Sequence, residues 1–114
     1  VYDMVRFKEW MKQARERGLT EKVYILAGVT PLKSARMAKY MAAKVAGITI
    51  PEQMITRMEG VAKERAAAEG IKICLETIQE LREIPGLAGI HIMAIEWEEK
   101  VAEIVKAAGL HPRP

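Results

Sequence analysis

The chain alternates between short, uniformly apolar runs and longer segments in which apolar residues recur every three or four positions. The apolar runs at residues 23–28 and 89–95 contain almost no polar alternation, which is typical of strands buried on both faces of a parallel sheet. The periodic segments predict helices over 4–17, after Pro31, over 52–59, from about 62 or 70 to 84, and over 97–108. Residues 1–3 read as the tail of a further strand. This order predicts an α/β fold built from βα repeats around a parallel sheet.

Turn and cap residues mark the segment that joins the first apolar run to its helix. The run ends in Gly28-Val29-Thr30-Pro31, where Pro31 suits the first turn of a helix and Thr30 is a possible N-cap. We predict that the buried stripe of this helix comprises Ala38, Met41, Ala42 and Val45. Because parallel strands present their ligand sites at the carboxyl edge of the sheet, this turn is the first candidate for a binding loop.

The predicted strands are too few for an independent sheet. Strands as apolar as 23–28 and 89–95 require cover on both faces and neighbours on both edges. We therefore expect the chain to be a piece of a larger α/β unit, either cut from a longer polypeptide or completed by another one.

Composition adds few constraints. The 114 residues are 50% apolar and carry a net charge of +3, spread without a run of five like charges, so neither nucleic acid nor an acidic partner is implied. No apolar run is long enough to span a bilayer, and the lone Cys74 excludes a disulfide framework or a cysteine-based metal site. A reducing, cytoplasmic location is the expectation, with no membrane or metal.

Four ordered blocks resemble one enzyme family. Residues 24–34, 50–51, 69–72 and 89–97 together resemble the C-terminal part of methylenetetrahydrofolate reductase, most closely the form of acetogens and related anaerobes and archaea. The resemblance implies a (βα)8 TIM barrel in which residues 1–114 supply the end of strand 6 and strands 7 and 8 with their helices, and not an independent domain. It also implies FAD as cofactor and reduction of methylenetetrahydrofolate to methyltetrahydrofolate.

The resemblance places this chain on the late-strand side of the folate cleft. It implies substrate-binding roles for Thr30, Pro31, Met54, Met58, Met93, Ile95 and Glu96. In the family the acidic catalytic residue and most flavin contacts lie on earlier strands, so no catalytic residue is expected here and the chain alone is expected to be inactive. The electron donor stays open among NADH, NADPH, ferredoxin and a partner subunit. A zinc-containing companion subunit and an oligomer are further implications.

Several residues have structural as well as functional interpretations. His91, in the middle of a predicted strand, is expected to be a buried structural histidine. Lys33 and Ser34 are either anion contacts at a helix N-terminus or ordinary surface residues. Glu96 either contacts the pterin or caps the last helix, with capping preferred. Two alternatives for the whole chain are a non-catalytic accessory chain that docks on a partner barrel and a fragment of another pterin-binding barrel.

Overall fold

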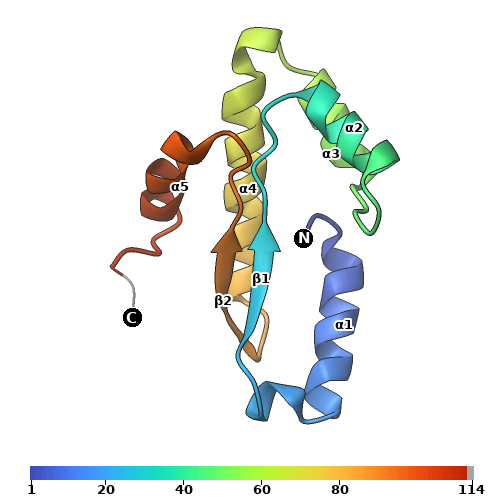
Figure 1. The fold of residues 1–114 in the computed structure, drawn as a ribbon, viewed down its shortest axis with the longest axis vertical. Coiled ribbons are helices and arrows are strands. Elements are labelled where there is room, and N and C mark those ends of the chain that lie inside the picture. Colours follow the sequence, from blue (N-terminus) through green and yellow to red (C-terminus); the bar gives the residue numbers. More distant parts are fainter. Residues whose placement is uncertain (113–114) are drawn as a thin grey trace.

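The computed structural model describes residues 1–112, which form a small parallel sheet with helices packed around it (Figure 1). The helices are α1 (Met4–Glu16), α2 (Ala35–Lys44), α3 (Glu52–Glu59), α4 (Ala66–Arg82) and α5 (Val101–Ala107), and the strands are β1 (Ile25–Val29) and β2 (Leu87–Ile92). Single 3-10 turns occupy Leu19–Glu21, Lys63–Arg65 and Glu98–Lys100. No helix in the described part is long and apolar enough to cross a membrane.

The predicted α/β class with a parallel sheet is confirmed. Strands β1 and β2 pair in parallel, with Leu26 opposite Gly89 and Val29 opposite Ile92. The backbone N–H of Met93 extends the pairing by one hydrogen bond, 2.8 Å long, to the carbonyl of Val29. Both strands are displaced from their predicted bounds by a few residues, because apolar composition locates a strand without fixing where its hydrogen bonds begin and end.

The first residues of the chain lie at the other edge of β1. The backbone nitrogen of Val1 donates to the carbonyl of Gly28, and the hydroxyl of Tyr2 donates to the carbonyl of Thr30 at 2.9 Å. This position is where a neighbouring strand would end, as the sequence suggested, although residues 1–3 have no strand assignment. The start of α1 is thereby fixed beside the carboxyl end of the sheet.

The main core lies between one face of the sheet and helix α4. Helix α4 packs behind both strands, flanked by α1 on one side and α5 on the other (Figure 1). Helical spacing predicts an apolar stripe of Ile71, Cys74, Leu75, Ile78 and Leu81 on α4, and all of them are buried except Leu75, which is partly buried. Burial of one apolar side chain of this size stabilises the folded state by about 1.5–3 kcal/mol. Helix α4 is therefore the main anchor of the sheet.

A second core joins α2 and α3 to the first half of α4. Its most buried members are Leu32, Ala38 and Met58, each exposed by 1% or less. Of the predicted stripe on α2, Ala38 and Met41 are buried, but Ala42 and Val45 are exposed. Val45 lies outside the stripe because α2 ends at Lys44, and Ala42 lies within the helix but away from the second core.

The opposite face of the sheet is open. Leu26 is 58% exposed and the adjacent Tyr24 is 92% exposed, on the side away from α4. Gly28 and His91 are opposite partners in the pairing, so their side-chain positions share this face. His91 is exposed, and the prediction that it is buried is wrong for this chain, because α4 packs on the other face of the sheet.

Two helix starts differ from prediction. Helix α2 begins at Ala35 with Ser34 as its N-cap, whose hydroxyl accepts a 3.1 Å hydrogen bond from the N–H of Met37. Thr30 precedes an extended stretch and is not the cap. The last helix begins with a 3-10 turn, and its N-cap residue Trp97 provides no side-chain cap. Glu96 does not cap it either; its φ of 51° is instead left-handed.

Candidate functional site

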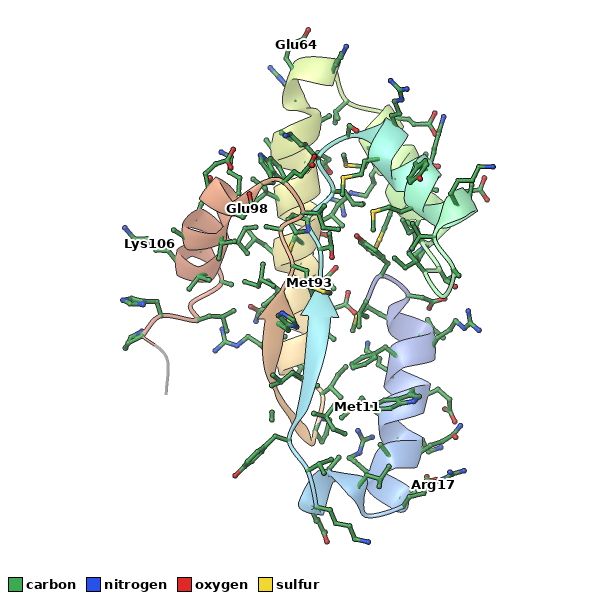
Figure 2. The ribbon with its side chains drawn as sticks, in the orientation of Figure 1. Met11, Arg17, Glu64, Met93, Glu98 and Lys106 are labelled. Atoms are coloured by element: carbon green, nitrogen blue, oxygen red, sulfur yellow. The ribbon has the colours of Figure 1, made fainter. Side chains whose placement is uncertain are left out.

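A cleft of about 610 Å³ opens near the carboxyl ends of the two strands. Its wall consists of Val1, Tyr2, Asp3, Arg6, Phe7, Trp10, Thr30, Gly47, Ile48, Thr49 and Met93. Figure 2 labels Met93 at the end of the strands, where the chain leaves the sheet. The cleft therefore lies at the edge where parallel sheets bind their ligands.

Helix α1 and the loop between α2 and α3 build two sides of the cleft wall. Helix α1 contributes Phe7 and Trp10, whose rings stack with centroids 6.0 Å apart and planes inclined by 14°. The loop between α2 and α3 contributes Thr49, whose hydroxyl accepts a 3.0 Å hydrogen bond from the guanidinium of Arg6. This bond joins the start of α1 to the far side of the cleft. The wall thus combines an aromatic surface with the cationic Arg6, while the carboxylate of Asp3 in the same wall caps α1 by accepting from the backbone N–H of Arg6. An aromatic surface beside a guanidinium suits a flat ligand bearing an anionic group.

Met93 occupies space that Gly28 leaves free. A Cβ atom on Gly28 would lie 2.7 Å from the terminal methyl of Met93, so the methionine folds over the glycine. The thioether is therefore packed against the sheet at the base of the cleft while 40% of the residue stays exposed. Methionine adapts readily to irregular surfaces, which suits a contact with an apolar ring.

Tyr2 and Thr30 form a hydrogen-bonded pair beside the cleft. Tyr2 is 7% exposed, and its hydroxyl donates to the carbonyl of Thr30. Burial raises the pKa of Tyr2 to about 12. The phenol is therefore neutral at physiological pH, and its proton fixes the turn after β1.

The seven predicted substrate-binding residues are only partly brought together. Thr30 and Met93 line the cleft. Pro31 is fully buried directly behind Thr30, Met58 is 1% exposed within the second core, and Met54 packs against that core. The two remaining residues, Ile95 and Glu96, are exposed on the segment that follows β2 and do not line the cleft.

Arg6, Trp10 and Thr49 are cleft residues that the sequence reasoning missed. Arg6 and Trp10 stand at helical spacing directly after the predicted strand tail, so the start of that helix was the available signal. Thr49 gave no local signal. It reaches the cleft only because α2 and α3 fold back toward α1, and its bond to Arg6 spans 43 residues of sequence.

Lys33 and Ser34 have structural partners in this chain. The ammonium of Lys33 lies 5.7 Å from the centre of the Trp97 ring, within cation–π range. The hydroxyl of Ser34 is used as the cap of α2. These contacts tie the turn after β1 to the segment after β2, and they favour the surface interpretation of both residues over anion binding.

The described residues offer a binding surface. Within residues 1–112 no three His, Cys, Asp or Glu side chains gather into a metal site. Burial raises the pKa of the Cys74 thiol to about 11, so this cysteine is not an activated nucleophile. Among the described residues every buried side-chain nitrogen and oxygen has a hydrogen-bond partner. The arrangement can therefore hold and orient a ligand at the edge of the sheet.

Comparison with known proteins assigns the chain to a family. Residues 1–109 match the family described as "Methylenetetrahydrofolate reductase". A curated protein of Caenorhabditis elegans, described as "Probable methylenetetrahydrofolate reductase (NADPH)", is 24% identical over 111 residues, which cover 96% of this chain and 16% of that relative. The chain thus spans about a sixth of the length of the relative. With a match that extends over nearly all of its residues, this chain belongs to the methylenetetrahydrofolate reductase family.

Proposed function

We propose that this chain forms the last strands of a (βα)8 barrel that reduces methylenetetrahydrofolate to methyltetrahydrofolate. The observation that carries the proposal is the cleft at the carboxyl ends of two parallel strands in a chain of this family. In barrel enzymes this edge holds the substrate. We call this chain together with the remaining strands the complete barrel, whether those strands lie on the same polypeptide or on another.

In this proposal the chain's own residues bind and orient the folate. Met93 and the stacked pair Phe7 and Trp10 offer apolar surface to a planar ring, and Thr30, directly after β1, lines the same cleft. Arg6 is a cation at the rim that suits a carboxylate of the substrate. These residues hold the ring in place and exclude water from one side of it.

FAD is part of the proposal as the group that supplies hydride to the folate. A flavin cradle would leave polar groups of this chain in need of a ligand, and among residues 1–112 no buried side-chain donor or acceptor lacks a partner. We therefore assign the flavin to the remaining strands of the complete barrel and give this chain no flavin-binding role. NADPH, named for the relative from Caenorhabditis elegans, is one candidate donor of the electrons.

The direct test uses the complete barrel purified under anaerobic conditions. Addition of methyltetrahydrofolate should bleach the visible absorbance of the bound flavin, because the reaction runs in reverse. Replacing Met93 by Asp should raise the KM for the folate by about tenfold or more, since a charge would be buried against an apolar ring. The matched control Met37→Asp, on α2 away from the cleft, should leave this KM unchanged. A colourless protein that FAD cannot reconstitute, or a flavin that the folate does not bleach, would contradict the proposal.

A second candidate function rests on the open face of the sheet. The exposed Leu26 and the outer edges of β1 and β2, on which no further strand pairs within residues 1–112, also suit an accessory chain that docks on a partner barrel. The mass of the denatured polypeptide that carries this sequence separates the two functions. A polypeptide long enough to hold eight strands supports the reductase, and a short one that purifies with a separate barrel supports the accessory chain.

A further inference from the structure

Helix α2 carries a concentration of positive charge that the rest of the chain does not share. Residues 30–51 contain four Lys or Arg residues and no Asp or Glu. The whole chain has 18 basic and 15 acidic residues, so 14 basic and 15 acidic residues remain outside this segment. The net charge of +3 therefore originates in one segment. The even spread of charge expected from the sequence describes only the remainder of the chain.

The charged residues of α2 lie on one exposed face. Arg36, Tyr40 and Lys44 follow each other at intervals of four residues, which places them on the same side of a helix. All three are exposed, with Tyr40 at 62%. The opposite side of α2 carries Ala38 and Met41, which are buried in the second core. An aromatic side chain thus stands between two cations on a surface that packing within this chain does not use.

Two of the cations on α2 form no ion pair within residues 1–112. Lys39 pairs with Glu59 at 3.1 Å, whereas in the part of the chain that the structure describes Arg36 and Lys44 have no ion pair. Lys33, just before the helix, is held over the ring of Trp97. The basic face of α2 is defined here as Arg36, Tyr40 and Lys44.

We propose that the basic face of α2 docks an acidic surface of another protein. Exposed arginine and tyrosine are enriched at protein interfaces, and uncompensated charge speeds association with a partner of opposite sign. Double-stranded nucleic acid is the poorer match, because neutralising a phosphate lattice takes many cations and this face offers two. The loop after α2 lines the cleft, so the docked protein would lie beside the cleft entrance. This inference does not depend on the proposed reductase activity.

The experiment measures binding of poly-L-glutamate to the complete barrel at low salt. The test variant is Arg36→Gln with Lys44→Gln. The control is Lys12→Gln with Lys106→Gln, which removes the same charge from exposed positions on α1 and α5. The test variant should weaken binding by about fivefold beyond the control, the effect of two exposed charge contacts. Circular dichroism of both variants should match that of the unmodified protein, because all four side chains are exposed.

Three results would overturn the proposal. The first is equal weakening in the test and control variants, which would show that only net charge matters. The second is absence of binding to poly-L-glutamate at low salt. The third is tighter binding of a DNA duplex, or of phosphatidylserine vesicles, that is lost in the test variant alone, which would assign the same face to nucleic acid or to a membrane surface.

Discussion

At the scale of single residues, close backbone approach fixes how the two cores meet. Gly70 of α4 lies against the turn after β1, and a Cβ atom at this position would be 1.6 Å from the carbonyl oxygen of Leu32. No side chain fits there without moving the backbone of the helix or of the turn. The turn carries Thr30 into the cleft, so the absence of a side chain at Gly70 sets the geometry of the site.

We predict that Gly70→Ala destabilises the fold by about 1–3 kcal/mol, the usual cost of overpacking. Alanine has the higher helix propensity, but the stabilisation this gives, about 1 kcal/mol, does not offset the cost of the clash. Chemical denaturation of the unmodified and altered proteins gives the difference. Gly60→Ala is the control, because a Cβ atom at Gly60 would lie 3.3 Å from its nearest neighbouring atom. This substitution should change the free energy of unfolding by no more than about 1 kcal/mol. Equal effects of the two substitutions would contradict the close approach.

Cys74 makes a second prediction at this scale. Burial raises its pKa to about 11, so at pH 8 the reactive thiolate is about a hundredfold rarer than for an exposed cysteine. Labelling of the folded protein by a disulfide reagent at pH 8 should therefore be slow and should become fast in denaturant. Rapid labelling under native conditions would mean that α4 does not bury this thiol.

At the scale of elements, ion pairs hold α3 against α4. The guanidinium of Arg57 donates to Glu69 at 2.7 Å and to both carboxylate oxygens of Glu76 at 2.9 Å. This two-pronged arrangement on Glu76 is the favourable geometry for an arginine and a carboxylate. It orients the short helix α3, which has no side-chain N-cap of its own.

The pairing makes stability depend on pH. The hydrogen bonds from Arg57 hold the pKa of Glu76 below its usual value. A carboxyl group whose pKa is lower in the folded state stabilises that state above its unfolded pKa, and the contribution is lost as the pH falls through the folded pKa. Because Glu76 is half exposed, the contribution is below about 1 kcal/mol.

We predict that Glu76→Gln lowers the free energy of unfolding at pH 7 and that this difference shrinks between pH 7 and acid pH, as the pH falls through the lowered pKa of Glu76. Urea denaturation across this pH range measures it. The control Glu83→Gln, at an exposed position after α4 for which no ion pair is seen within residues 1–112, should show no such pH-dependent difference. A difference for Glu76→Gln that stays constant as the pH falls from 7 into the acid range would contradict the ion-pair explanation.

The extent of successful prediction also differs by element. The stripe on α4 could be predicted because apolar residues recur at helical spacing along a helix of 17 residues. The start of α2 could not be predicted, because Thr30 and Ser34 are both acceptable caps, and in the structure it is the hydroxyl of Ser34 that accepts from the N–H of Met37. The cleft was predicted at the correct edge of the sheet, but Arg6 and Thr49 meet there only through tertiary folding.

At the scale of the whole molecule, the sheet is covered on one side only. Helix α4 buries one face, while Leu26 and His91 on the other face are exposed. In the proposed barrel this open face points into the interior, where side chains from other strands fill the space. The exposure of His91 is then a property of the isolated chain. An apolar sheet that has only two strands among residues 1–112 is expected to associate with further strands.

The most direct test of this account is the accessibility of the open face in the complete barrel. With cysteine introduced as Leu26→Cys, a maleimide reagent should label the isolated chain readily and the complete barrel at least about tenfold more slowly. The control Gln79→Cys, on the exposed side of α4, should be labelled equally in both. Protection of Leu26→Cys alone is the predicted result. Equal labelling of both cysteines in the complete barrel would contradict the claim that this chain closes a barrel.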